Sequence, residues 1–397
     1  MRTDHQATPL REVRPATGSA AVADIIEWLS GDECHELDDA GLIAGLGCRL
    51  TAAGIPLDRL TLHLRTLHPE IFGRSLAWAP HEPVEVHDRE HGLVVAAPFV
   101  GSPLRHVMET RAPVLVRPGT ADGAAWTEID VFQGRRLSEI FMVPLCNADG
   151  PVSAAAFGTA RLGGFSAASR AALERIVPAL RSACELRTLR RTELTLLDTY
   201  IGTTTARRIL GGRIRRGEIE SLEAALMLCD LRGFTALSNR LSGARVLELL
   251  NVYFDHVVPA ITAAGGEVLK FMGDGVLAFF HGDEARLACT AALQAAFNAL
   301  GSLEQMAGTD IPLQAGIALH YGVVDYGNIG SGRRLDFTLI GPDVNLVSRI
   351  QAVCSTTSHR LLMSQRVATL LPPGQAVSIG CHDLKGFDAP QELYATP

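Results

Sequence analysis

The sequence predicts an α+β protein of two domains. Its 397 residues are more than one ordinary hydrophobic core holds together. Hydrophobic residues make up 47% of the chain and charged residues 20%, so we expect most of it to fold. In both halves, segments with helical periodicity alternate with short apolar segments typical of strands, and a basic helix-like stretch lies between the halves. This order favours two α+β domains joined by a helical linker.

Composition excludes several classes of protein. The net charge of −7 argues against a general nucleic-acid binder. No run approaches 18 consecutive apolar residues, and the first 15 residues lack the apolar segment of a signal peptide, so we expect no membrane span. The eight cysteines include no CxxC pair, which is typical of reduced thiols. We therefore expect a cytoplasmic protein.

The first half is expected to be an α+β domain over residues 21–180, after a flexible tail over residues 1–20. Leucines at 60, 62 and 64 alternate with polar residues, which predicts a half-buried strand. We expect further strands over 75–78, 114–117, 140–146 and 153–159, and helices over 21–29, 38–53, 104–110 and 167–187. The strand VSAAAFGTA and the helix GGFSAASRAALERIVPAL resemble the end of a GAF-type sensor domain. That resemblance implies a small-molecule or ionic regulator; a PAS-like or unrelated α+β module is the alternative.

Residues 181–218 are expected to form a helical linker. Eight arginines lie between Arg187 and Arg216, against only Glu193 and Asp198. A broken stripe of leucines accompanies them, without a clean heptad. Two interpretations remain open: a solvated basic helix between domains, or a paired signalling helix.

Two aspartates in the second half follow or interrupt apolar strands. The run LEAALMLCD ends in Asp230, and Gly233 then allows a tight turn into a helix that begins at Phe234 and Thr235. Asp274 lies in a Gly-Asp-Gly turn between two apolar strands, which predicts a hairpin. Such a turn alone is usually only a turn. Two carboxylates at the ends of adjacent strands, however, can share Mg²⁺ or Mn²⁺.

Two more segments carry groups suited to phosphate. In RRLDFTLIGPDVNLVSRI, residues 336–340 are strand-like and Asp343 is expected to cap the following helix. Asn345 and Arg349 are four residues apart and share a helix face, where an arginine can stabilise charge on a phosphoryl group. Near the C-terminus, DLKGFDAPQELY carries Lys385, and only one other residue of the chain, Lys270, is a lysine.

Together these segments resemble class III adenylyl and guanylyl cyclases over residues 219–397. The resemblance implies a ferredoxin-like catalytic domain that works as a homodimer with shared active sites. It implies roles for ten residues: the metal site at Asp230, Asp274 and Leu231, base contacts at Lys270 and Thr338, the ribose or transition state at Asn345, phosphates at Arg349 and Lys385, and further substrate contacts at Phe234 and Thr235.

The implied reaction converts ATP to 3′,5′-cyclic AMP and pyrophosphate with two Mg²⁺ or Mn²⁺ ions per site. Thr338 stands where many adenylyl cyclases carry Asp, which is similar to a Thr-containing subgroup, and Asp336 is nearby but out of register. Lys270 favours ATP, because guanylyl cyclases typically carry Glu there. The alternatives are a guanylate cyclase and a catalytically silent nucleotide-sensing protein.

Overall fold

A computed structural model describes residues 18–92, 99–127, 135–146, 151–305 and 311–397. Most of the expected N-terminal tail lies outside the described residues. The chain divides into two compact units, Met1–Leu196 and Leu197–Pro397, each with its own sheet. Both units mix helices and strands, which confirms the α+β class.

The first unit is built on a six-stranded antiparallel sheet with the order β3-β2-β1-β6-β5-β4. Its strands are β1 Arg59–Arg65, β2 Ile71–Trp78, β3 Glu85–Glu90, β4 Val114–Val116, β5 Glu139–Leu145 and β6 Ser153–Thr159. The five strands expected in this half are all present. The sixth, β3, was missed because its sequence EVHDRE is almost entirely polar.

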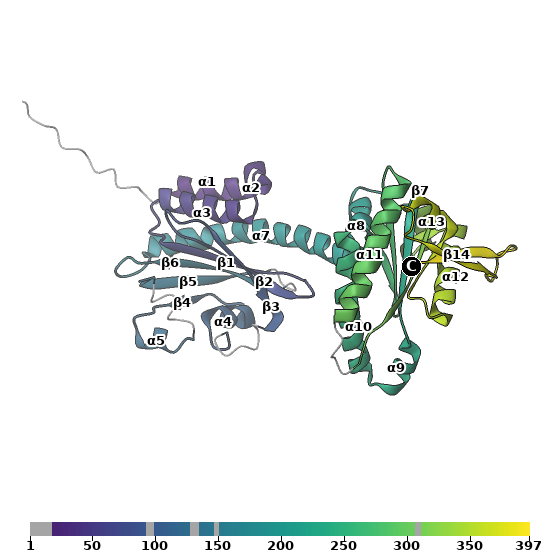
Figure 1. Cartoon of the computed structure of the whole chain (residues 1–397). Helices are drawn as coiled ribbons and strands as arrows, with labels where there is room; N and C mark the ends of the chain where they lie inside the picture. Colours follow the sequence, from purple (N-terminus) through teal and green to yellow (C-terminus); the bar gives the residue numbers. More distant parts are fainter. Residues whose placement is uncertain (1–17, 93–98, 128–134, 147–150, 306–310) are drawn as a thin grey trace, which may run out of the picture. The chain divides into compact units, whose positions relative to one another are not determined.

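Helices cover both faces of this sheet (Figure 1). On one face lie α1 Ser19–Ser30, α2 Asp32–Glu36, α3 Asp39–Ala52 and the first half of α7 Ala167–Ile201. They pack on Leu60, Leu62 and Leu64 of β1. On the other face lie α4 Pro103–Thr110 and α5 Ala121–Ala124, over a smaller core that includes Val107, Ile140 and Met142.

The expected linker is helical over only part of its length. Helix α7 continues to Ile201, Gly202 breaks it with a φ of +85°, and α8 Thr203–Leu210 follows. Residues 211–218 form turns, so the prediction of helix there was wrong. The reason lies in Gly211 and Gly212, which end α8.

The second unit has an eight-stranded sheet with the order β13-β14-β12-β10-β7-β9-β8, and β11 pairs with β10. The strands are β7 Ile219–Leu231, β8 Glu267–Met272, β9 Gly275–His281, β10 Ala315–Ser331, β11 Arg334–Ile340, β12 Leu361–Ser364, β13 Val377–His382 and β14 Gln391–Ala395. The helices are α9 Phe234–Arg240, α10 Gly243–Ala263, α11 Ala285–Gln305, α12 Pro342–Thr356 and α13 Gln365–Leu370. The succession from β7 to β10 is the βαββαβ order of a ferredoxin-like fold.

The central strand β7 is buried on both faces, which explains its long apolar run. Met227 and Cys229 face α10 and α11, whereas Leu226 and Leu228 face α12. By length and composition alone, α10 is the one helix among the described residues that could cross a membrane. Five of its side chains are buried in the protein core.

Candidate active site

Asp230 and Asp274 meet at one end of the sheet. Asp230 is the penultimate residue of β7, and Asp274 lies in the turn between β8 and β9. Since β9 pairs with β7 through Val276 and Cys229, the turn lies next to the end of β7. Gly273 makes the turn possible with a φ of +69°, which side chains disfavour.

The electrostatics of this carboxylate pair favour the binding of a cation. Burial, together with the hydrogen bond and negative charge of Asp274, raises the pKa of Asp230 to about 7. The main-chain N–H of Leu231 and the charge of Arg232 act in the opposite direction. Two crowded carboxylates of this kind are stabilised when a divalent cation binds between them.

The donors present fit a hard cation that takes its remaining ligands from water and phosphate. In the described part of the chain, no group of three or more His, Cys, Asp and Glu side chains could hold a metal. Leu231 offers only a main-chain oxygen, because its side chain is a hydrocarbon, which is buried in the core. Mg²⁺ is commonly bound by one or two carboxylates together with substrate phosphates.

The turn after β7 leads directly into α9. Gly233 precedes the helix with a φ of +72°, a conformation that favours glycine. Phe234 packs partly against the core, and Thr235 is exposed. The two predicted substrate contacts therefore lie four and five residues beyond Asp230, at the start of a short helix.

Lys270 and Asp336 form a second pair, which the sequence reasoning missed. Lys270 Nζ donates to the Asp336 carboxylate at 2.7 Å. Lys270 lies on β8 beside a register shift, and Asp336 lies on β11. Thr338 is two residues further along β11 and buried. The alternation of strand side chains places 336 and 338 on one side of β11, and this signal could have identified Asp336.

A large cavity adjoins the Lys270–Asp336 pair. Its volume is about 540 Å³, and it lies within the second unit. Lys270 and Phe271 of β8 line it together with Asp336, Phe337 and residues 198–205. A polar pair at the wall of such a cavity is suited to bind one edge of a planar base.

Asn345, Arg349 and Lys385 are exposed and stand apart from both pairs. Asn345 and Arg349 lie on α12, and Lys385 lies in the loop between β13 and β14. Across the described residues, none of these three side chains has a hydrogen bond or ion pair in this structure. All three groups are thus available to a ligand or to another copy of the chain.

Asp343 does not cap α12 as predicted but contacts residues of β10. The residue before α12 is Gly341, and no side chain caps the helix there. The Asp343 carboxylate instead accepts from the main-chain N–H of Val323 at 2.8 Å and lies 3.0 Å from His320 Nε2. It therefore ties α12 to β10, and the capping prediction was wrong.

Residues 219–393 match the family described as adenylate and guanylate cyclase catalytic domain. An adenylate cyclase of Anabaena cylindrica is 29% identical over 190 residues, covering 46% of this chain and 38% of the relative. A photoactivated adenylate cyclase subunit beta of Euglena gracilis is 29% identical over 185 residues, covering 45% of this chain and 21% of the relative. The chain thus spans well under half the length of these relatives.

Similar solved structures include adenylyl cyclase CyaB from P. aeruginosa, at 27% identity and a TM-score of 0.41, covering 45% of this chain and 96% of that one. A bacterial light-regulated adenylyl cyclase is 26% identical with a TM-score of 0.49, and the match covers 56% of this chain and 65% of that one. The family match, together with the motifs in their order, supports a class III adenylyl/guanylyl cyclase catalytic domain over residues 219–393.

Proposed function

We propose that the chain is an adenylate cyclase that converts ATP to 3′,5′-cyclic AMP and pyrophosphate. The observation that carries the proposal is the pair Asp230 and Asp274, which lies at adjacent strand ends within the matched catalytic domain. Lys270, held by Asp336 at a cavity wall, supports adenine as the base.

Each charged or polar residue of the site has a separate role in the proposed reaction. Asp230 and Asp274 would hold Mg²⁺ or Mn²⁺, which when bound promotes attack of the 3′-hydroxyl on the α-phosphorus and neutralises the leaving pyrophosphate. Arg349 would stabilise the charge that spreads over the α-phosphoryl oxygens, and Lys385 would bind the β- and γ-phosphates. Asn345 would orient the ribose. No side chain needs to act as a nucleophile.

Selection of ATP follows from hydrogen-bond donors. An ammonium group has three donors, so Lys270 can hold Asp336 and also donate to adenine N1. Guanine is protonated at N1 and cannot accept there. The Thr338 hydroxyl can accept from the adenine amino group.

We propose further that two copies complete each active site. Asn345, Arg349 and Lys385 are exposed and have no described contact with the aspartate pair. A two-fold pair of catalytic domains would bring these groups of one copy to the aspartates of the other, and would contain two equivalent sites.

The N-terminal unit is proposed to be a GAF-like sensor that regulates the cyclase. Its mixed sheet-and-helix build supports a sensor module, and helix α7 continues from it without a Gly/Ser-rich break to Ile201. All eight cysteines are free, which supports a cytoplasmic location.

Product analysis tests the proposed activity. Purified chain is incubated with ATP or with GTP, each with Mn²⁺, and the cyclic product is separated by chromatography. We expect cyclic AMP from ATP and far less cyclic GMP from GTP. Preferential formation of cyclic GMP would show a guanylate cyclase instead. Nucleotide binding without either product would show a silent nucleotide-sensing protein.

A further inference from the structure

The Asp343 carboxylate at the start of α12 is bound by two groups of β10. One of its oxygens lies 3.0 Å from His320 Nε2, and the other accepts from the main-chain N–H of Val323 at 2.8 Å. His320 is 1% exposed, and its Nδ1 lies 2.8 Å from Ser364 Oγ. Because a carboxylate only accepts, His320 donates through Nε2 and accepts the serine hydroxyl through Nδ1. A chain of hydrogen bonds thus runs from the end of β12 through β10 to α12.

His320 takes part in this chain as a neutral ring. Burial lowers its pKa, the hydrogen bond and negative charge of Asp343 oppose that effect, and the charge of Arg366 assists it. Arg366 lies 3.7 Å from the same carboxylate but is 63% exposed, so solvent screens this ion pair. The directional hydrogen bonds from His320 and Val323 are therefore the contacts that hold Asp343.

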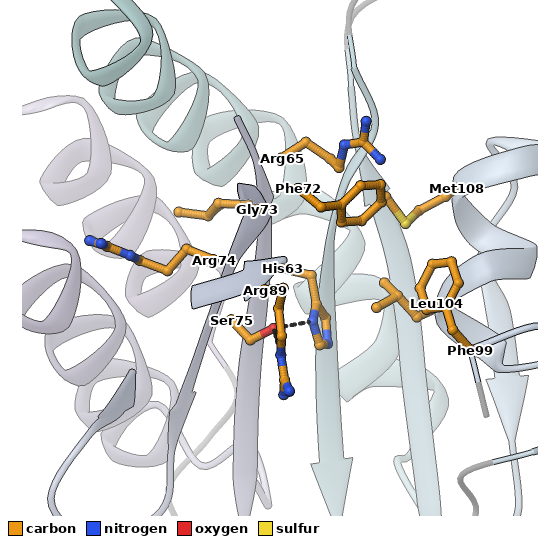
Figure 2. Close-up of a pocket in the computed structure, with 11 residues that line it drawn as sticks. His63, Arg65, Phe72, Gly73, Arg74, Ser75, Arg89, Phe99, Leu104 and Met108 are labelled. Atoms are coloured by element: carbon orange, nitrogen blue, oxygen red, sulfur yellow. Dashed lines mark hydrogen bonds between the residues drawn. The ribbon is translucent and has the colours of Figure 1, made fainter. Parts of the chain in front are cut away.

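The first unit offers a comparison for this arrangement. Figure 2 shows His63 beside Ser75, and His63 Nδ1 lies 3.1 Å from the serine Oγ. Burial, with the nearby charges of Arg89 and Arg59, lowers the pKa of His63 to about 4. No carboxylate of the described residues bonds to that ring. A histidine–serine pair thus stays neutral without an acid, so the Asp343 carboxylate has a role other than setting the charge of His320.

The fold leaves room for this carboxylate at Gly322 of β10. A Cβ there would lie 2.1 Å from Asp343 Oδ2 and 2.7 Å from Asp343 Cβ, far inside van der Waals contact. The strand cannot yield, because Gly322 is paired with Ala224 of the central strand β7. Only a residue without a side chain therefore allows Asp343 to reach β10.

The connection from β11 into α12 gives the helix little other directional support. Gly341 precedes the helix with a φ of +140° and has no side chain that could cap it. Val347 and Ile350 are buried against the sheet and hold the helix there by apolar contacts. Such contacts are not directional, whereas hydrogen bonds are. Asp343, in the first turn, is thus the residue that fixes how α12 is rotated and shifted along the sheet.

This tie also sets α12 relative to the strand that carries Thr338. Thr338 of β11 is paired with Gly327 of β10, and Asp343 bonds to the same strand β10. Asn345 and Arg349 follow two and six residues after Asp343 on the helix. A single nucleotide that is held by its base at Thr338 and by its phosphates at Arg349 needs a fixed separation between β11 and α12.

We propose that Asp343, held by His320 and Val323, is a positioning residue that sets Asn345 and Arg349 against the substrate. Asp343 itself touches no substrate in this proposal. Loss of the tie would lower the rate, because a misplacement of about 1 Å can cost about 100-fold. The effect on catalysis rests on the proposed function, whereas the tie itself is measured without turnover.

Three variants separate the parts of this tie. Asp343→Ala removes the carboxylate, and Gly322→Ala keeps every polar group but forces the carboxylate or the helix to move. We expect each to lower kcat for cyclic AMP formation about tenfold or more and to leave KM for ATP within about threefold, because Arg349 acts in the transition state. Asp343→Asn should retain most of the rate, since its amide oxygen accepts from Val323 and the other tautomer of His320 accepts from its NH₂.

Controls separate positioning from loss of stability. Gly301→Ala in α11 is the matched control for Gly322→Ala, because a Cβ at Gly301 meets no described atom within 4 Å, and its kcat should equal that of the wild type. Thermal unfolding confirms that each variant is folded. Wild-type kcat in folded Asp343→Ala and Gly322→Ala would overturn the proposal. A loss in Asp343→Asn as large as in Asp343→Ala would assign the effect to charge and would also contradict positioning.

Mixing of chains identifies which catalytic groups Asp343 serves. In a dimer with shared sites, Asp343→Ala chains should regain activity with Asp230→Ala chains, which supply an intact α12, but not with Arg349→Ala chains. A chain that is merely unstable would behave alike with both partners. Recovery with Arg349→Ala chains would show that Asp343 does not act through α12.

Hydrogen exchange measures the tie in the absence of turnover. Amides of residues 345–348 in the first turns of α12 should exchange about tenfold or more faster in Asp343→Ala and Gly322→Ala than in the wild type, and at the wild-type rate in Gly301→Ala. Unchanged exchange in both variants would refute the tie, whatever the chain catalyses. Faster exchange in a chain that makes no cyclic nucleotide would confirm the tie and contradict the proposed function only.

Discussion

At the scale of single residues, Asp230 shows how the fold favours the proposed metal site. Its pKa of about 7 lies above the value of about 3.9 expected in the unfolded chain. Between these values the folded protein holds a proton that the unfolded chain releases. The stability contributed by this group is therefore present below about pH 4 and lost as the pH rises to about 7.

Asp230→Asn tests this account of the metal site. Without metal at pH 8, we expect the variant to melt roughly 2–4 °C above the wild type, because the carboxylate repulsion is gone. Mn²⁺ should raise the melting temperature of the wild type but not that of the variant, and turnover should be abolished. Differential scanning fluorimetry with and without Mn²⁺ measures both effects. An equal rise with Mn²⁺ in both proteins would contradict the assignment.

Lys270 carries the proposed choice of base. Lys270→Glu replaces the donor opposite adenine N1 and sets a second carboxylate beside Asp336, so we expect kcat/KM for ATP to fall about 100-fold or more. Asp336→Asn should cost less than about fivefold, because Asp336 is 63% exposed and exposed ion pairs contribute about 1 kcal/mol or less. If Lys270→Glu cyclised ATP as well as the wild type, adenine selection would reside elsewhere.

At the scale of elements, sequence reasoning succeeded where a segment's own pattern sets its structure. The apolar run ending at Asp230 and the hairpin around Asp274 are of this kind, since each strand carries its burial pattern locally. It failed for β3, which is an edge strand with polar side chains and takes its structure from pairing with β2. The same holds for Asp336 and Asp343, whose partners Lys270 and His320 lie on other elements of the fold.

Helix α8 links the end of α7 to the strands of the proposed base site. The Thr205 hydroxyl is hydrogen-bonded to Tyr326 of β10 in a buried position, and the Arg208 guanidinium lies 4.6 Å from the centre of the Tyr326 ring. The ring of Tyr326 in turn packs on Phe337 of β11, between Asp336 and Thr338. A shift of α8 would therefore displace the strand that carries the proposed base contact Thr338.

Truncation tests this coupling. Removal of residues 1–180 deletes the sensor with the first part of α7, and leaves the rest of α7, α8 and the second unit. We expect the basal rate of cyclic AMP formation to change several-fold in one direction, because a continuous helix transmits strain that a flexible linker would absorb. Specific activities are compared for full-length and truncated protein, both shown to be dimeric by light scattering. Identical activities would argue against a coupling role for α7.

At the scale of the whole molecule, the proposed catalytic groups fall into two sets. One set is the aspartate pair at the end of β7, and the other comprises the exposed Asn345, Arg349 and Lys385. Lys270 and Asp274 are only four residues apart on one hairpin, and in a dimer each can serve a different site. Two damaged chains should then be able to complement each other.

The central claim, ATP cyclisation at sites shared by two copies, is tested by mixing two inactive chains. Asp230→Ala and Arg349→Ala proteins are combined, subunit exchange is verified by tag pull-down, and cyclic AMP is measured. With random pairing, half the dimers are mixed, and each mixed dimer has one intact site, so activity should return to about a quarter of the wild-type value. A mixture that exchanges subunits but makes no cyclic AMP would contradict the shared site.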